Sequence, residues 1–340
     1  MRERKCVLPH VGQLAAWYSP RDLNGIDSVL ILDSFGVLMP VLGNDFVFVT
    51  HFIRNLRGGS QPFLSQASDG LLYVVKLADN PQGPNLLFNE SAGSELYRAC
   101  GLIVPERRPL VISDFFLDNN RECWRETPEG RTRPASGICF GSRFLGKTGD
   151  RLLEILPGCC FRRVRNRAHF WLAWLIDVCA EQTDNRQAIF VEDSDSWLNA
   201  YFVDNGHLFG GPRADMKKNF IASRYLDQRI YQAVSPEEPA EYLKVVRSLD
   251  TDKLWKQIEL IPAGWMQTSA LAGFEDCIQR LSKPRLVQNL LDTIIDAQER
   301  RTATESGNAA GERKLPAAVL RPEVHCAGFG HGQSRYPACA

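Results

Sequence analysis

The chain has 340 residues, 44% of them hydrophobic and 24% charged, which is a normal composition for a globular protein with one large domain or two ordinary ones. Lys and Arg total 40 and Asp and Glu total 40, so the net charge is zero and no global field would draw the protein onto nucleic acid or an anionic membrane. No apolar run is long enough to span a bilayer, and the opening stretch MRERKCVLPHVGQ lacks the apolar segment of a signal peptide, so a cytoplasmic protein is expected.

Residues 1–44 are expected to form an N-terminal extension of unassigned role, with short strands in the apolar runs SVLILDSF and VLMPVL. The segment 46–78 then predicts an antiparallel meander, because three runs rich in β-branched and aromatic residues are separated by turn signals. The first of these turns is Arg57-Gly58-Gly59-Ser60, and the second is Asp69-Gly70.

A helix is expected next, with Pro84 in its first turn and Gly101 at its C-terminal cap. Two further strands are expected, at 109–117 and at 136–145, because both segments are rich in apolar and β-branched residues. Residues 45–145 are therefore predicted to form a strand-rich lobe that contains one helix.

The second half of the chain predicts mainly helices. The segment 168–182, AHFWLAWLIDVCAEQ, indicates a strong helix, two short strands are expected around AIFVE and NAYFVD, and helices continue through 235–299. Residues 301–340 show little periodicity and are expected to be a disordered tail. Residues 146–300 would thus form a helical lobe, and the whole chain an α+β fold with two lobes.

The stretch GSRFLGKT, from Gly141 to Thr148, matches the phosphate-binding pattern G-x-x-x-x-G-K-[ST] of P-loop hydrolases. A true P-loop joins a buried parallel strand to a helix whose N-terminus faces the phosphates. Here Gly149 and Pro157-Gly158 disfavour such a helix, and no β-α-β unit precedes the motif. A P-loop NTPase is therefore the least favoured hypothesis, and the alternative is a strand that leads into the connection between lobes, with Lys147 solvated.

The turn at Gly58, Gly59 and Ser60 predicts phosphate binding of another kind, because a glycine-rich hairpin tip can direct main-chain N–H groups toward phosphate oxygens. A plain hairpin is the commoner explanation of such a turn when it is considered alone. The turn gains weight only from the residues that follow it.

Lys76 lies within the third strand of the meander, where alternation places it on the face opposite to Val75 and Leu77. It would face either solvent or, as in protein kinases, the phosphates of ATP. The kinase lysine pairs with a glutamate of the next helix, and that position is assigned to Glu90, with Glu95 as the competing candidate.

Two aspartates lie on either side of the short hairpin expected after the strong helix. Asp184 precedes it, and Asp204 begins the sequence Asp-Asn-Gly at its end. In a kinase, one such carboxylate orients or deprotonates the acceptor hydroxyl and the other, in a D-x-G context, holds Mg²⁺. Each is more typical of a turn when taken alone, but the order of turn, lysine, glutamate and two aspartates is much more specific.

With these residues in place, the sequence resembles the HipA-like kinase domains of bacteria, in particular the shorter HipA-type domain. The resemblance covers about residues 45–300 and rests on RGGSQPFL, DGLLYVVKLADNPQGP, NESAGSELYRACGLIVP, FGSRFLG, TDNRQAIF and YFVDNGHLFGG. It implies a two-lobed protein-kinase-like fold, ATP and Mg²⁺ as cofactors, and Ser/Thr phosphorylation of a protein substrate. It also admits an antitoxin-like partner, whereas no nucleic acid or membrane is expected as a partner.

The resemblance also implies a role for each candidate residue. Asp184 and Gln187 would be catalytic, and Asp204 and Gln187 would hold the metal. The expected ATP-binding residues are Gly58, Gly59, Ser60, Gln61, Lys76, Glu90, Phe140 and Gly141, of which the last two would meet the adenine at the connection between lobes.

Two positions depart from the kinase pattern. Ile189 stands where the pattern H-R-D-x-x-x-x-N would place Asn, so Gln187 or Asn185 would have to replace it on the metal side. Asn205 replaces the usual Phe of D-F-G. The alternative function is therefore a catalytically weak or inactive pseudokinase that binds nucleotide or acts as an interaction module.

Three remaining patterns are interpreted in structural terms. The basic run Arg162, Arg163, Arg165 and Arg167 would recognise an acidic substrate or, as the favoured interpretation, form a solvated face.

The ten cysteines lack repeated C-x-x-C spacing, which favours reduced thiols in a cytosol. The group His325, Cys326 and His331 hints at a metal site, but a tail that happens to contain them is favoured.

Overall fold

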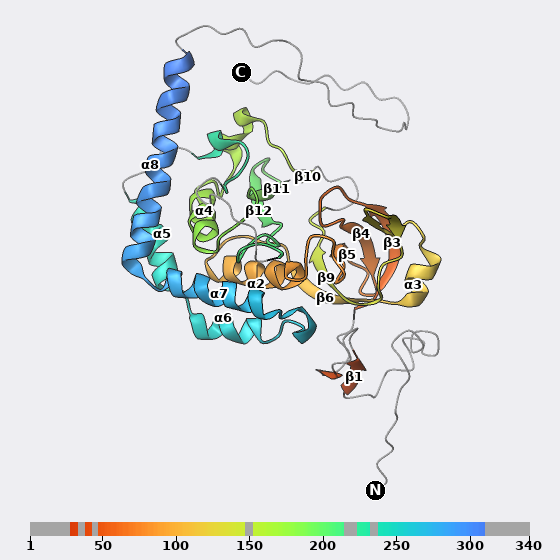
Figure 1. Ribbon diagram of the computed structural model, residues 1–340. Helices are drawn as coiled ribbons and strands as arrows, with labels where there is room; N and C mark the ends of the chain where they lie inside the picture. The colour runs from red at the N-terminus through yellow and green to blue at the C-terminus, as the bar shows by residue number, and fades with distance from the viewer. Residues whose placement is uncertain are drawn as a thin grey trace, which may run out of the picture. The chain divides into compact units, whose positions relative to one another are not determined.

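The structure is a computed structural model that describes residues 28–32, 38–42, 47–146, 152–213, 223–231 and 237–309 (Figure 1). The chain divides into one unit that ends at Gln298 and a second that begins at Glu299. The described part of the second unit is the last portion of a single helix, and all other described residues belong to the first unit.

The N-terminal extension contains an antiparallel pair of strands, β1 (Ser28–Leu32) and β2 (Leu38–Leu42), where the sequence predicts two short strands. A five-stranded sheet follows, made of β3 (Val49–Asn55), β4 (Phe63–Ala67), β5 (Leu72–Lys76), β6 (Arg107–Ile112) and β9 (Gly137–Arg143). Its order is β3-β4-β5-β9-β6 with every neighbouring pair antiparallel, so the predicted meander is confirmed (Figure 1).

The strand predicted for 109–117 is wrong in its second half. After β6 the chain forms a short helix, α3 (Asp114–Asn119), whose first turn is capped by Ser113 Oγ accepting from the Phe116 N–H at 3.1 Å. A small hairpin that the sequence did not predict, β7 (Arg125–Thr127) with β8 (Gly130–Thr132), lies between α3 and β9.

The helix predicted after Pro84 is α2 (Leu86–Ala99), and it ends as expected at Gly101, whose φ is +77°. Its residues from Leu86 to Tyr97 are all buried. Gly93 permits this close packing, because a Cβ there would lie only 2.5 Å from Leu208 Cδ1. The helix therefore presses against the segment that follows the last strand of the second sheet.

The second half of the chain contains a three-stranded antiparallel sheet and the strong helix predicted at 168–182. The sheet has the order β10 (Leu152–Leu153), β11 (Gln187–Glu192), β12 (Leu198–Val203). The helix α4 (His169–Cys179) is buried from Phe170 onward, and Trp171 and Trp174 lie in its core as the apolar pattern indicates.

The remaining helices follow the predicted helical region 235–299. They are α5 (Glu238–Arg247), α6 (Thr251–Ile258), α7 (Thr268–Leu281) and α8 (Pro284–Ala309), with short 3-10 turns η1 (Gly158–Arg163), η3 (Gln228–Ile230) and η4 (Ala263–Trp265). The boundary predicted at 301 is wrong, since α8 continues to Ala309, and the predicted helix start at Ser235 lies outside the described residues. No described helix combines the length and the hydrophobicity needed to cross a membrane.

Two hydrophobic cores match the division into a strand-rich and a helical half. The smaller core covers one face of the five-stranded sheet and includes Val75, Leu77 and Phe116. The larger core joins α2 to α4, the second sheet and the C-terminal helices. Because α2 belongs to the larger core, the opposite face of β5 looks toward α2 and the second half of the chain.

Candidate functional site

Lys76 ends β5 on the face opposite to Val75 and Leu77, and it is only 6% exposed, so the interpretation that it faces solvent is wrong. Its ammonium group forms an ion pair with Glu90 Oε1 of α2. It also lies 2.7 Å from Asp204 Oδ1, in the segment after β12. Three charged residues from distant parts of the sequence therefore meet in one buried cluster.

Glu90 is the partner of Lys76, as predicted, while Glu95 faces elsewhere and pairs with Arg98 and Arg107. Glu90 also accepts hydrogen bonds from the main-chain N–H groups of Asn205 at 3.2 Å and Gly206 at 3.0 Å. The carboxylate of α2 thus fixes both the lysine and the loop that carries Asp204.

Asp204 is placed by an unusual local backbone. Its φ is +60°, the left-handed region that aspartate tolerates better than most residues. A larger residue at Gly206 would crowd α2, because a Cβ there would lie 2.4 Å from Leu86 Cδ1 and 3.0 Å from Glu90 Oε1. The Asp-Asn-Gly sequence therefore folds tightly against α2, with the Asp204 side chain 25% exposed.

Lys76 and Asp204 stabilise each other's charge, whereas burial raises the pKa of Glu90. Burial alone would lower the pKa of Lys76, but the carboxylates of Asp204 and Glu90 raise it above its ordinary value. Burial alone would raise the pKa of Asp204, but the Lys76 ammonium holds it well below its ordinary value. Lys76 is therefore a fixed cation and Asp204 a fixed anion at neutral pH.

Gln187, at the start of β11, contacts Asp204 of this cluster. Its Nε2 donates to Asp204 Oδ2 at 2.7 Å, and the residue is exposed. Register explains the approach, since Gln187 pairs with Val203, the residue directly before Asp204. Ile189 pairs with Tyr201 farther along the same strands, so it lies away from this end of the hairpin.

Asp184 lies in the loop that leads into β11 and is half-buried, with Oδ1 accepting from the Asn185 N–H at 2.8 Å. Its neighbour Thr183 joins this loop to the segment after Asp204. The Thr183 N–H donates to the His207 carbonyl at 2.9 Å, and Thr183 Oγ1 lies 3.1 Å from His207 Nδ1. The two aspartate loops are therefore bonded to each other at one end of the hairpin.

The glycine-rich turn joins β3 to β4, and the segment before α2 holds it. Asn80 Nδ2 donates to the Ser60 carbonyl at 2.8 Å. A Cβ at Gly59 would lie 2.7 Å from Gln82 Nε2, and the same amide nitrogen is 3.1 Å from His207 Nε2. Gln82 and His207 thus connect the turn to the Asp204 loop. Both lie in stretches that carry the resemblance, but the sequence assigns no role to either residue.

Gln61, expected to bind ATP, has its side chain engaged by the hairpin β7–β8. Its Nε2 donates to the Glu126 carbonyl at 2.9 Å, and its Oε1 accepts from the Glu126 N–H at 2.7 Å. The Gln61 N–H closes the turn on the Gly58 carbonyl at 3.0 Å. The side chain therefore holds the base of the turn in place.

The expected position of Phe140 and Gly141 at the connection between lobes is corrected. Both lie inside β9, where Gly141 pairs with Val75 on one side and Arg108 on the other. The sheet occupies their main-chain groups, so these groups cannot meet adenine as the resemblance implies. The connection begins after Arg143, the last residue of β9.

The same geometry argues against a P-loop. Gly141 is in a central antiparallel strand, and a Cβ there would lie 2.5 Å from Leu110 Cδ1, so close packing explains the glycine. The described chain resumes after the motif in a strand, β10, and not in a helix. Lys147 and Thr148 lie outside the described residues.

Most of the basic run has internal partners. Arg163 pairs with Glu192, and Arg165 pairs with Asp193 at 2.9 Å. Arg167 donates to the carbonyls of Arg229 and Ile230. These arginines therefore fasten the segment before α4 to its surroundings. The predicted metal group of the tail, His325, Cys326 and His331, lies outside the described residues.

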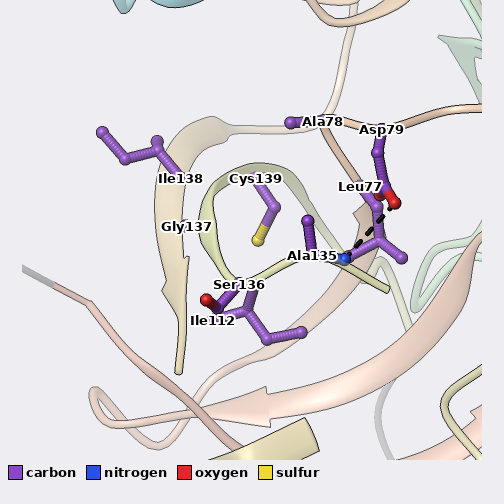
Figure 2. Close-up of a pocket in the computed structure, with 9 residues that line it drawn as sticks. All are labelled: Leu77, Ala78, Asp79, Ile112, Ala135, Ser136, Gly137, Ile138 and Cys139. Carbon is purple, nitrogen blue, oxygen red and sulfur yellow. Dashed lines mark hydrogen bonds between the residues drawn. The ribbon is translucent and has the colours of Figure 1, made fainter. Parts of the chain in front are cut away.

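A small cavity of about 80 Å³ lies on the other face of the five-stranded sheet, where Leu77, Ile112 and Cys139 line it. Figure 2 shows Asp79 at its edge, with Asp79 Oδ2 accepting from the Ala135 N–H at 3.3 Å. Because Lys76 points away from Leu77, this cavity is separate from the cluster of Lys76, Glu90 and Asp204.

A buried ion pair between Arg186 and Asp177 lies next to the site, and the sequence analysis did not predict it. Arg186, between the two assigned residues of its loop, is 2% exposed and binds the carboxylate of Asp177 with two hydrogen bonds, of 2.9 and 2.7 Å. The signal for it was a single acidic residue, Asp177, inside the otherwise apolar helix α4, which requires a buried partner.

Comparisons with known proteins add a distant similarity. No family model matches the chain, and no curated protein matches its sequence. A crystal structure of the Golgi casein kinase with Mn/ADP bound aligns at a TM-score of 0.43 and 13% identity, covering 76% of this chain and 75% of that one. A second crystal structure of the Golgi casein kinase aligns at 0.44 and 13%, covering 75% and 74%. These similarities are too distant to argue from, so the site is interpreted from its own contacts.

Proposed function

We propose that the protein is an ATP- and Mg²⁺-dependent phosphotransferase of the protein-kinase type, which phosphorylates Ser or Thr of a protein substrate. The observation that carries the proposal is the buried cluster of Lys76, Glu90 and Asp204. A strand lysine, a glutamate of the following helix and an aspartate of a D-x-G segment are the groups that kinases use around the phosphates and metal.

The cluster supports nucleotide binding on electrostatic grounds. Burying Lys76 together with the carboxyl groups of Glu90 and Asp204 is costly unless another ligand completes the cluster, and burial raises the pKa of Glu90. One side of the cluster is open, since the Asp204 side chain is 25% exposed and Gln187 is exposed. A phosphate chain with its metal would bring charge of both signs to that side.

The residues present fit a divalent metal. Asp204 offers carboxylate oxygens, which are ligands that Mg²⁺ prefers. Gln187 contacts Asp204 Oδ2 through its amide nitrogen at 2.7 Å, so its amide oxygen would face the metal only after the amide turns. When bound, the metal would supply neutralisation of phosphate charge. This chain would supply Lys76 against the phosphates and Asp184 against the acceptor hydroxyl.

The turn at Gly58, Gly59 and Ser60 would cover the phosphates from the other side. Its link to the Asp204 loop through Gln82 and His207 supports this placement, because it brings the turn close to the metal-side carboxylate. The resemblance to HipA-like kinases, the acceptor protein and an antitoxin-like partner remain predictions.

A second candidate is a nucleotide-binding module without transfer. The observation in its favour is Ile189, which lies within β11 opposite Tyr201 and leaves no second-metal Asn at that place. Phosphate transfer to the protein itself or to added proteins would exclude this candidate.

The direct test of the proposal is thermal unfolding with and without Mg·ATP. If the affinity is in the micromolar range, ATP at millimolar concentration should stabilise the wild type by about 2–4 kcal/mol. Lys76→Met should remove most of this stabilisation, because its ammonium is the cation that faces the phosphates. A matched control is Lys253→Met, a lysine on α6 far along the chain from the cluster. An unchanged shift in Lys76→Met would refute the role of Lys76.

A further inference from the structure

Arg186 lies at the centre of a buried polar network that joins the two aspartate loops to α2. Beyond its two bonds to Asp177, its Nη1 donates to the Val203 carbonyl and to Asn205 Oδ1, both at 2.9 Å. Its guanidinium also lies over the Tyr97 ring, 4.9 Å from the centroid. Nearly every donor of this side chain is therefore used within the protein.

The network is closed on all sides. The Arg186 and Asp177 side chains are 1% and 0% exposed. Tyr97 donates its hydroxyl to Asp177 Oδ1 at 2.5 Å, so the helix α2 contributes to the same carboxylate. Burial alone would lower the pKa of Arg186, but the Asp177 carboxylate raises it, so the charge is permanent.

Asn205 carries the network to the site. Its Oδ1 accepts from Arg186, while its Nδ2 donates to Ser94 Oγ of α2 at 3.2 Å. It stands between Asp204, which has a left-handed backbone, and Gly206, whose N–H binds Glu90. The side chain that replaces the Phe of D-F-G is thus 1% exposed and bonded on both sides.

A buried ion pair is a poor source of stability, because an apolar pair of similar volume often serves as well. Arg186 stands directly between residues that the proposed function uses, Asp184 two positions before and Gln187 one position after. Its Nη1 fixes the main chain at Val203, the last residue before Asp204. The geometry therefore favours orientation of the loop over stability as its role.

We propose that Arg186 is a positioning residue, which holds the Asp204 loop through Asn205 and Val203 so that Asp204 and Gln187 converge on one metal ion. In this chain a polar link from Arg186 through Asn205 to Ser94 couples the loop to α2, where the kinase pattern uses an aromatic ring. The claim about the metal rests on the proposed function, whereas the claim about the loop does not.

The test uses Arg186→Lys in the full chain. Lysine keeps the charge opposite Asp177, but its single ammonium cannot bind both carboxylate oxygens and still reach Val203 and Asn205. Arg280→Lys is the matched control, because Arg280 also forms an ion pair at the end of α4, with Glu181 at 2.5 Å, and its bonds go to that ion pair and to the Cys179 carbonyl instead of the Asp204 loop.

The first readout is hydrogen exchange, which needs no ligand. In Arg186→Lys, exchange in the peptide 203–208 should rise by about tenfold or more, while α4 stays protected as in Arg280→Lys. Unchanged exchange in 203–208, or an equal rise throughout the protein, would overturn the positioning role.

The second readout is binding of Mn²⁺ alone, followed by titration. Loss of an orienting partner typically costs tenfold or more in metal affinity, so the Mn²⁺ dissociation constant should rise by about tenfold in Arg186→Lys and stay unchanged in Arg280→Lys. The double variant Asp177→Leu/Arg186→Met removes both charges together with the bonds to Val203 and Asn205, so it should bind Mn²⁺ as weakly as Arg186→Lys. Wild-type affinity in the double variant would show a purely structural role.

Failure of the two claims can be told apart. If the wild type binds neither Mn²⁺ nor ATP, the proposed function fails, and the exchange measurement still decides whether Arg186 holds the loop. If the wild type binds both and Arg186→Lys binds them equally well, the positioning role fails while the proposed function stands.

Discussion

The protein contains two groups of buried charged residues, and they differ in whether solvent can reach them. The pair of Arg186 and Asp177 is sealed, and its hydrogen bonds are made to protein groups on every side. The cluster of Lys76, Glu90 and Asp204 is sealed toward α2 but open at Asp204, whose side chain is 25% exposed. The difference teaches that burial alone does not mark a binding site. A set of charges that is complete shapes the fold, and a set that is open on one side is available to a ligand.

The largest expected effect is the loss of phosphotransfer when Asp184, the residue assigned to the acceptor, is replaced. Asp184 is assigned to the acceptor hydroxyl, which is absent when ATP binds alone. The residue assigned to the phosphates is Lys76, and its ion pairs are with Glu90 and Asp204, not with Asp184. Asp184→Asn should therefore leave Mg·ATP binding nearly unchanged and reduce phosphotransfer or autophosphorylation by about 10²–10⁴-fold. The measurement is transfer of labelled phosphate beside a thermal-shift titration.

Asp204→Asn is the matched comparison, because it should weaken Mg²⁺-dependent binding and transfer together. Wild-type turnover in both variants would show that this hairpin is not the catalytic element. A wild type that binds Mg·ATP but transfers no phosphate would instead favour the module without transfer.

The second effect concerns the stability of the sealed pair. Asp177→Asn leaves the Arg186 charge buried without its partner and should cost about 3–5 kcal/mol in the free energy of unfolding. Glu90→Gln should cost less, since Lys76 keeps Asp204 as a partner at 2.7 Å. Urea unfolding of both variants checks the order, and a larger loss in Glu90→Gln would contradict the comparison.

Much of the open cluster could be predicted because each of its members has a local signal. Alternation along a strand placed Lys76 on a separate face, and the order of elements placed Glu90 on the following helix. The sealed pair could not be predicted as a pair, since its bonds depend on how α4 and the loop approach each other in three dimensions. The only sequence signal for the pair was Asp177, an isolated acidic residue in an apolar helix.

The errors of prediction also have physical causes. The segment 109–117 has the composition of a strand, but the capping bond of Ser113 begins a helix inside it. Gly141 was placed at the connection between lobes by the resemblance to HipA-like kinases, whereas it lies inside β9 in close contact with Leu110. The solvated face predicted for Arg163 and Arg165 agrees with their side chains, which are 44% and 45% exposed, but no local pattern indicated their partners Glu192 and Asp193 beyond the strong helix.

A third effect is the dependence of stability on pH. The pKa of Asp204 is lowered in the folded protein, so its charged form adds stability that is complete above the ordinary value near 4 and is lost as the pH falls through the lowered value. The acid slope of unfolding free energy should thus be shallower in Asp204→Asn than in the wild type, by at most about 1.4 kcal/mol per pH unit. Chemical unfolding at a series of pH values below 5 measures it, with Asp276→Asn on α7 as the control.

The smallest effect is expected at Lys147, the lysine of the P-loop pattern. A P-loop lysine contacts the β- and γ-phosphates, so its loss would abolish nucleotide binding. In this fold the first glycine of the pattern is paired on both sides within β9, and Lys76 already supplies the cation of the open cluster. Lys147→Ala should therefore change the free energy of Mg·ATP binding by less than about 0.5 kcal/mol. Complete loss of ATP binding in a folded Lys147→Ala protein would show that the phosphates bind at the segment after β9 and not at the cluster of Lys76, Glu90 and Asp204. Solvent access to a buried charged cluster would then be no guide to the nucleotide site.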